Sequence, residues 1–306
     1  LKIVSRASLI TVIALPTTVF MFVILPRTSY PLLHFLNRPT HASTGFTDNV
    51  SLGKVSDIQE DATVIFRAQM EQVDENALYW RGIVLDFFDG TSWKRLQKER
   101  PVKAGRVRLR GRQVRQTIYL EPYGNRYLFA LDKPSDILYR NISKNTDLTY
   151  ALPDNVHRRT GYETSSTLSD VIGEESIDRD RYLQMPGGME KTRELVKTLS
   201  DGRDQEETVK TLLRFLRGGY QYSLENLPLS ENPLEDFLFK HKYGNCEYFA
   251  SAMAVMLRIA GIPSRMVGGY KGGYYNDAGG YYLVPQKNAH VWVEAFPDKK
   301  GWIRLD

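Results

Sequence analysis

The sequence is poor in cysteine and histidine, and both shortages exclude classes of structure. Cys246 is the only cysteine among 306 residues, so no disulfide bond can form within the chain. This does not exclude the cell envelope, because a fold with a large enough core needs no disulfides. The five histidines are scattered without the close pairs of a zinc site, and no acidic loop has the spacing of a calcium site. We therefore expect neither a metal nor another cofactor.

The excess of positive over negative charge is also small. The net charge of +5 is mild, and no motif that interleaves aromatic with basic residues indicates binding to DNA or RNA. A hydrophobic content of 42% and a charged content of 25% are ordinary for a globular protein, and the length suffices for two domains. We expect no nucleic-acid partner.

The N-terminal region lacks charged side chains over residues 7–25. A helix of this length would be about 28 Å long, which nearly matches the ~30 Å core of a bilayer. Pro16 would kink the helix, which a membrane helix tolerates better than a soluble one. We expect a transmembrane helix here, with lipid as its partner, and a signal peptide or a buried soluble helix as the alternatives. Basic residues flank both ends, so the positive-inside rule does not orient the helix.

The lone cysteine lies in a run that is typical of a catalytic nucleophile. Gly244 and Asn245 are turn signals, and an apolar helical pattern begins at Cys246. The positive end of a helix stabilises a thiolate, which is the reactive form of the side chain. Taken alone, a single cysteine is more often a buried small hydrophobic residue. The case for catalysis therefore depends on its partners.

Two further residue types that thiol chemistry needs follow Cys246 in order. His290 begins an apolar strand-like run, and Asp306 ends another. In such chemistry a thiol attacks a carbonyl carbon, an imidazole takes and returns the proton, and a carboxylate orients the imidazole. The three residues are thus a candidate catalytic triad. Asp306 is also the last residue, and the chain begins at Leu1 rather than at methionine, so we expect a fragment of a longer protein.

A resemblance to a known family lies in four ordered blocks, at residues 244–252, 258–270, 289–294 and 301–306. Through them the region from about Tyr220 to Asp306 resembles the transglutaminase-like domain of the papain-like thiol enzymes. The match is close for the bacterial membrane-anchored transglutaminase-like proteins of the TgpA type. The resemblance implies that Cys246 is the nucleophile, His290 the base and Asp306 the orienting carboxylate.

The resemblance also has implications for topology. It implies that the N-terminal helix is the last of several membrane helices and that another follows residue 306. It implies further that the region between them faces the periplasm or the cell exterior. We therefore expect a protein of the cell membrane whose catalytic region is extracytoplasmic.

We expect an α+β fold in four parts. Residues 1–35 form the transmembrane helix and an interfacial segment, and residues 36–60 form a polar linker without sustained periodicity. Residues 61–185 carry strand patterns and form a small antiparallel β domain, which we expect to be a sandwich with a packing role. Residues 186–306 form a transglutaminase-like core of the papain-like cysteine proteinase type, which we expect to be truncated at its C-terminal end.

Within the last part, the thiol is predicted on a helix and its partners on a sheet. Helical patterns cover residues 190–199, 206–216 and 246–260, and strand patterns cover 265–270, 281–285, 290–296 and 302–306. In the preceding β domain, Trp80 and Trp93 are predicted core residues.

The predicted reaction is thiol acyl transfer on glutamine carboxamides of proteins or peptides. Cys246 attacks the carboxamide and expels ammonia, and an amine or water then takes the acyl group, which gives amine transfer or deamidation. The partners are a glutamine-bearing substrate and an amine acceptor. Candidate oxyanion donors are the backbone N–H of Cys246 and a side chain such as Tyr222. Trp292 shares the strand face of His290, so it either walls the cleft or belongs to the core.

Two other function classes stay open. A cysteine peptidase or amidase of the cell envelope would use the same triad, because the nucleophile does not distinguish one amide from another. A non-catalytic envelope-binding module is disfavoured, because all three residue types of the triad are present in order.

Overall fold

The structure, a computed structural model, describes residues 12–21, 48–53, 61–96, 107–169, 171–174, 177–225, 227, 230–297 and 301–306. The chain divides into two compact units, Leu1–His41 and Ala42–Asp306. In the first unit, residues 12–21 form a helix. Among the described residues, no helix is both long and apolar enough to span a bilayer. The predicted span 7–25 extends past the described residues at both ends, so the transmembrane helix stays a prediction. The predicted interfacial segment that follows it lies outside the described residues.

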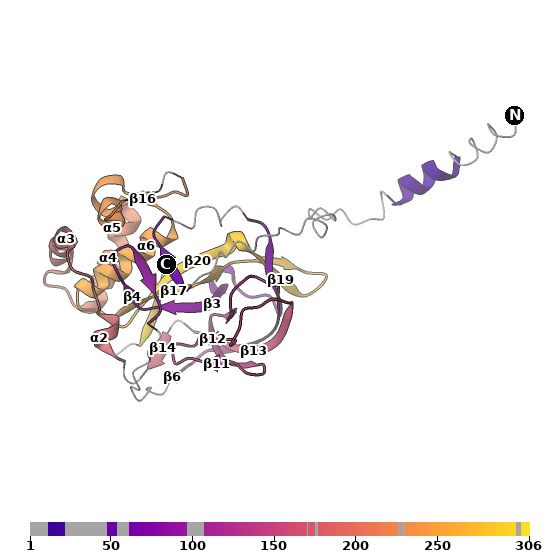
Figure 1. Cartoon of the computed structure of the whole chain (residues 1–306), viewed down its shortest axis with the longest axis horizontal. Helices are drawn as coiled ribbons and strands as arrows, with labels where there is room; N and C mark the ends of the chain where they lie inside the picture. Colours follow the sequence, from indigo (N-terminus) through magenta and orange to yellow (C-terminus); the bar gives the residue numbers. More distant parts are fainter. Residues whose placement is uncertain are drawn as a thin grey trace. The chain divides into compact units, whose positions relative to one another are not determined.

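The second unit contains a seven-stranded antiparallel sheet that holds both predicted partners of the thiol (Figure 1). Its strands lie in the order β6 (Val107–Arg108), β14 (Val171–Glu174), β21 (Trp302–Leu305), β20 (Ala289–Ala295), β17 (Ser264–Lys271), β3 (Tyr79–Leu85) and β9 (Ala130–Leu131). His290 lies on β20, and Asp306 directly follows β21. β3 pairs with β17, so a strand from near residue 80 lies two strands away from His290.

A second, six-stranded antiparallel sheet also combines strands from distant parts of the chain. Its order is β10 (Lys133–Leu138), β13 (Thr160–Leu168), β7 (Arg112–Leu120), β2 (Val64–Gln69), β19 (Tyr281–Pro285) and β18 (Tyr274–Asn276). Both large sheets therefore contain strands from each side of the boundary that we predicted between residues 185 and 186. The β-rich part is not a separate sandwich, because its strands pair with strands of the following part. Alternating apolar and polar residues predict that a strand exists, but they do not select its partner.

Three small sheets make up the remaining β structure of the described residues. They consist of β1 (Asn49–Ser51), β5 (Ser92–Lys94) and β4 (Phe87–Phe88); of β11 (Ser143–Lys144), β12 (Tyr150–Ala151) and β8 (Tyr127–Leu128); and of the parallel pair β15 (Gln221–Tyr222) and β16 (Tyr243–Gly244). β1 lies inside the predicted linker 36–60, so this part of the linker is strand; most of the linker falls outside the described residues.

The described residues of the second unit form several helices (Figure 1). They are α2 (Arg179–Tyr182), α3 (Glu190–Ser200), α4 (Gln205–Gly219), α5 (Pro233–Asp236), the π-helical turn η4 (Phe237–His241), α6 (Cys246–Ile259) and the short 3-10 turns η3 (Glu75–Ala77) and η5 (Gln286–Asn288). Of these, α3, α4 and α5 contact α6, and α6 packs on β17 and β20. The three helices predicted from periodicity are present as α3, α4 and α6. The tryptophans predicted in the core, Trp80 and Trp93, are fully buried.

Helix α6 is the central helix of this unit, and its sequence explains both its ends. Nearly every side chain on it is buried, as expected for a helix that is apolar on all faces. Its C-terminus closes at Gly261, which has a φ of 76° and donates to the carbonyl of Arg258, while Ile262 donates to the carbonyl of Leu257. This pair of hydrogen bonds is the Schellman motif, in which glycine adopts the left-handed conformation without strain. The packing of α6 on β17 and β20 fixes its N-terminus relative to the sheet.

Candidate active site

Cys246 is the first residue of α6 and lies at the positive end of the helix. Asn245 caps the helix, because its side chain accepts a hydrogen bond from the backbone N–H of Glu247 at 3.1 Å. The loop before the cap packs so closely that a Cβ on Gly244 would lie 2.8 Å from the Cβ of Tyr248. Only 5% of Cys246 is exposed. The local sequence thus holds the sulfur at the start of the helix, shielded from bulk water.

His290 on β20 lies between the predicted nucleophile and the predicted carboxylate. Its Nε2 is 2.8 Å from Oδ1 of Asp306, and the ring also makes a hydrogen bond with Cys246. Since Nε2 faces the carboxylate, Nδ1 is the nitrogen left for the sulfur. Burial lowers the pKa of His290, but the hydrogen bonds and negative charges of Asp306 and Cys246 outweigh it and raise the pKa to about 9. The ring therefore carries two protons at neutral pH.

Asp306 accepts hydrogen bonds from other residues besides His290. The hydroxyl of Tyr79 donates to its Oδ2 at 2.5 Å, and Nζ of Lys271 lies 2.5 Å from the same oxygen. Arg217 on α4 donates to the main-chain oxygen of Asp306 at 2.7 Å. Burial raises the pKa of the carboxyl, but the bonds to His290, Lys271 and Tyr79 dominate and hold the pKa well below its usual range. Asp306 is therefore an anion at all pH values where the protein would act.

Sequence reasoning missed Tyr79 and Lys271. Tyr79 is 227 positions from Asp306 in the sequence and reaches it only because β3 pairs with β17. A tyrosine at the start of an apolar strand resembles any core aromatic, so the sequence offers no local signal for its contact with Asp306. Lys271, at the end of β17, could have been flagged only from the register of the sheet.

A cleft of about 310 Å³ opens beside Cys246 and His290. Its wall is mostly apolar and comes from α4, α6, β20 and the residues around β15 and β21 (Leu213, Leu216, Arg217, Tyr220, Tyr222, Cys246, Phe249, Ala250, Met253, His290, Val291, Trp292, Val293, Leu305 and Asp306). A second, more open groove of about 390 Å³ also borders His290. Its wall is more polar (Tyr222, Leu224, Lys271, Lys287, Asn288, Ala289 and His290).

Tyr222 and Trp292 both line the cleft, as the sequence suggested, but in different environments. Tyr222 borders both the cleft and the groove and is 56% exposed, and its ring stacks on that of Phe249 at a centroid distance of 6.3 Å and an interplanar angle of 27°. Trp292 is 2% exposed, with its ring within 20° of parallel to that of His290. Trp292 is thus at once a core residue and part of the cleft wall.

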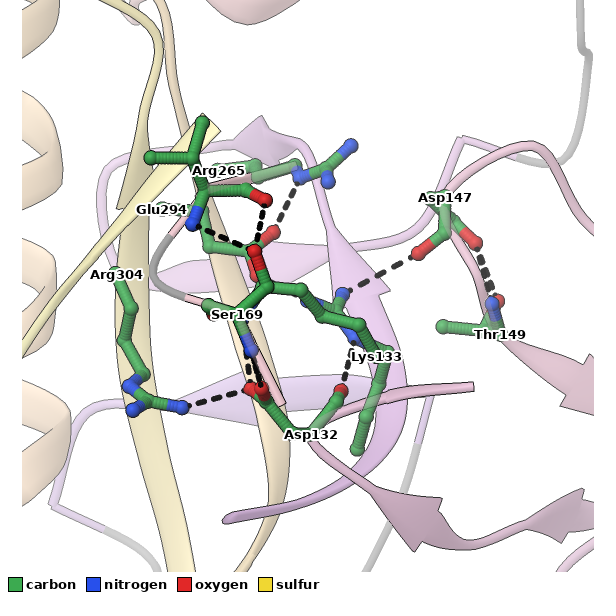
Figure 2. A network of polar contacts seen from close by, with 10 residues as sticks. Asp132, Lys133, Asp147, Thr149, Ser169, Arg265, Glu294 and Arg304 are labelled. Carbon is green, nitrogen blue, oxygen red and sulfur yellow. Dashed lines mark hydrogen bonds and ion pairs between the residues drawn. The ribbon is translucent and has the colours of Figure 1, made fainter. Parts of the chain in front are cut away.

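A network of buried charges supports the sheet behind the site (Figure 2). Glu294 on β20 pairs with Arg81 of β3 and, at 2.8 Å, with Arg265 of β17. Arg304 on β21 donates to Asp132 at 2.8 Å. Burial raises the pKa of Glu294, but the charges of Arg81 and Arg265 outweigh it and lower the pKa to about 2. These pairs tie β20, which carries His290, to β17 and β3, and they tie β21, which precedes Asp306, to Asp132.

The described residues contain no group of three or more His, Cys, Asp or Glu side chains that could hold a metal ion.

Comparison with known proteins places both halves of the chain. A family model for the TgpA N-terminal domain matches residues 2–173, and a model for the transglutaminase-like superfamily matches residues 193–306. A protein-glutamine gamma-glutamyltransferase of Pseudomonas aeruginosa is 32% identical over 302 residues, which is 96% of this chain and 45% of that protein. The protein YebA of Bacillus subtilis is 38% identical over 143 residues, 44% of this chain and 19% of that protein. The chain thus spans less than half the length of these curated relatives.

The fold also matches a solved structure. The crystal structure of the periplasmic domain of TgpA from Pseudomonas aeruginosa superposes with a TM-score of 0.77 at 32% identity, covering 85% of this chain and 93% of that one. Because the N-terminal family model alone covers more than half of the chain, and the superfamily model covers the region of Cys246, His290 and Asp306, the chain belongs to the TgpA-type, transglutaminase-like proteins.

Proposed function

We propose that the chain is a thiol acyltransferase that acts on the γ-carboxamide of glutamine side chains in proteins or peptides, through a triad of Cys246, His290 and Asp306. The observation that carries this proposal is the position of His290, hydrogen-bonded to Asp306 on one side and to Cys246 on the other. The similarity to a protein named protein-glutamine gamma-glutamyltransferase supports the choice of amide.

In the first half of the reaction, the Cys246 thiolate attacks the carboxamide carbon and forms a C–S bond. The C–N bond breaks as the intermediate collapses, and the nitrogen leaves as ammonia after it takes a proton from the His290 imidazolium. The raised pKa of His290 keeps that proton on the ring at neutral pH. The products are an acyl thioester on Cys246 and a neutral imidazole.

In the second half, a primary amine or water attacks the thioester carbon while His290 takes a proton from it. The C–S bond breaks, and the thiolate and the imidazolium are restored. An amine gives an isopeptide bond, and water gives glutamate. The two hollows that border His290 suit this two-substrate reaction, because the acyl donor can occupy the apolar cleft while the acceptor approaches through the polar groove.

The developing oxyanion needs hydrogen-bond donors. We assign this role to the backbone N–H of Cys246, in the first turn of α6, with the Tyr222 hydroxyl as the second donor. Tyr222 borders both hollows, which supports its assignment. Trp292 would exclude water from the thioester, because its ring lines the cleft beside His290.

We also propose that the N-terminal helix anchors the protein in a lipid bilayer and that the catalytic region lies on the extracytoplasmic side. The support is the uncharged stretch at residues 7–25 and the similarity to a structure described as a periplasmic domain.

Incubation of the full protein with a glutamine-rich protein and a fluorescent primary amine tests this function. We expect incorporation of the amine, or conversion of glutamine to glutamate, and we expect Cys246→Ala to abolish both while it melts like the wild type. Cleavage fragments without ammonia release would instead indicate a peptidase. Absence of both glutamine reactions, with Cys246 still open to alkylation by iodoacetamide, would overturn the proposal.

A further inference from the structure

Both carboxylate oxygens of Asp306 are engaged, and they have different partners. Oδ1 faces Nε2 of His290 at 2.8 Å. Oδ2 accepts from the Tyr79 hydroxyl at 2.5 Å and from Nζ of Lys271 at 2.5 Å. Hydrogen bonds to a charged group are about twice as strong as neutral ones, so these two donors constrain the rotation of the carboxylate.

The register of the sheet, rather than a flexible loop, brings the two donors together. Tyr79 and Lys271 are directly opposite each other in the pairing of β3 with β17. Side chains on directly opposed residues lie on the same face of an antiparallel sheet. The phenol and the ammonium therefore reach Asp306 from one rigid platform, in which β17 lies two strands and β3 three strands away from β21.

The ring of Tyr79 is held on two further sides. Trp292 meets it edge to face at a ring distance of 5.2 Å, and the guanidinium of Arg304 lies 3.9 Å from its centre. Arg304 is itself fixed by Asp132 at 2.8 Å. Only 6% of Tyr79 is exposed. The hydroxyl thus has little freedom to turn away from Asp306.

We propose that Tyr79 and Lys271 are positioning residues of the active site, which hold the Asp306 carboxylate toward His290 and set the strength of the Asp306–His290 pair. This inference rests on the proposed function. It makes β3, from the region that matches the TgpA N-terminal domain, a part of the catalytic machinery rather than a neighbouring support.

The arrangement has a consequence for the imidazole. The groups that face the pair are Cys246 from α6, Tyr79, Lys271 and Arg217, with Arg304 behind the phenol. Burial, with the charge of Asp306, raises the pKa of Tyr79, so the phenol stays a neutral donor.

Each of the two groups that donate to Oδ2 draws the negative charge of the carboxylate away from the imidazolium. The positive charge of Lys271 also repels the imidazolium. Removal of either donor should therefore raise the pKa of His290, even as it loosens the carboxylate. The two effects give a signature that a purely structural role would not produce, namely a slower reaction together with a shifted pH profile.

The test uses Tyr79→Phe and Lys271→Met in the full protein, with ammonia release from a glutamine peptide as the readout. Tyr119→Phe, at an exposed tyrosine, is the control for the first variant. Lys94→Met is the control for the second, because Lys94 is equally exposed and makes a comparable 2.6 Å ion pair with Asp89. We expect kcat to fall about tenfold or more in the two test variants, KM to change little, and the alkaline limb of the pH profile to move to higher pH. Lys271→Arg should restore most of kcat.

Two results would overturn the inference. One is a wild-type kcat and pH profile in both test variants. The other is a lower kcat with an unshifted profile and a lower melting temperature than the controls, which would indicate only a packing role. The rate of Cys246 alkylation by iodoacetamide against pH reports the same imidazole without any substrate. If the wild type releases no ammonia at all, the proposed function fails, while the alkylation profile of the variants still decides this inference.

Discussion

Nε2 of His290 and Oδ1 of Asp306 lie 2.8 Å apart, and this contact joins a strand to the chain end that follows the neighbouring strand. Asp306→Asn removes the negative charge that favours the imidazolium. We expect the pKa of His290 to fall from about 9 toward its ordinary value, so that the alkaline limb of the pH profile moves to lower pH. This shift is opposite in sign to the one expected for Lys271→Met.

The same variant should lose about a hundredfold or more in kcat, because the ring also loses its orientation. Ammonia release across pH measures both effects. Asp277→Asn, at an exposed aspartate in the turn between β18 and β19, serves as the control and should behave as wild type. An Asp306→Asn variant with an unchanged limb and unchanged kcat would show that Asp306 is not the orienting carboxylate.

Loss of the positive charge on His290 should also make the protein less stable at alkaline pH. Its folded pKa of about 9 lies above its unfolded value of 6.5, so its contribution is fully present below about pH 6.5 and is lost as the pH rises through about 9. We expect the wild type to lose on the order of 1–3 kcal/mol of unfolding free energy across this window. His290→Gln should lose less. Urea unfolding of both proteins at the two ends of the window measures the difference, and equal losses would contradict the raised pKa.

Glu294 is predicted to be the most sensitive acidic residue for stability. It lies between Arg81 and Arg265 in the buried network of Figure 2. Glu294→Gln would remove the carboxylate charge that pairs with two buried guanidinium groups, and we expect it to cost about 3–5 kcal/mol of unfolding free energy. Glu207→Gln, which breaks an exposed ion pair with Arg214, should change it by less than about 1 kcal/mol. Comparable losses in urea unfolding would refute the structural role of the network.

Gly269 is required by close packing rather than by its backbone angles. It lies opposite His290 in the pairing of β17 with β20, and a Cβ there would collide with the backbone carbonyl of Trp80. We expect Gly269→Ala to cost about 1–3 kcal/mol or more and to lower kcat by displacing His290. Gly218→Ala is the matched control, because a Cβ in that position of α4 meets no atom within 4 Å. There alanine should stabilise the helix by up to about 1 kcal/mol. Thermal unfolding of both variants checks the pair.

Features with local chemical signals could be predicted from the sequence. Helix α6 begins at Cys246 as predicted, because Asn245 is a strong cap, and it ends next to Gly261. Strand β19 has the predicted bounds, because an apolar run is set between turn residues and a proline. The order of the three residue types, together with the resemblance in four sequence blocks, indicated His290 and Asp306, which the structure brings together.

Features that depend on strand pairing could not be predicted. The contact of Tyr79 with Asp306 follows from the position of β3 beside β17, and nothing in the sequence near Tyr79 specifies that neighbour. For the same reason, the sequence did not predict that both large sheets combine strands from before and after residue 185. Glu294 did carry a signal, since a carboxylate inside an apolar strand run must find a buried counter-charge. Its partners Arg81 and Arg265 still required the fold.

Rapid-quench mass spectrometry of the protein mixed with a glutamine-bearing peptide tests the acyl thioester on Cys246 most directly. We expect a transient adduct on Cys246 whose mass equals that of the peptide less one ammonia. The adduct should disappear when an amine is added, and it should be absent from Cys246→Ala. Ammonia release without any adduct on Cys246, or release that persists in Cys246→Ala, would contradict the formation of this thioester.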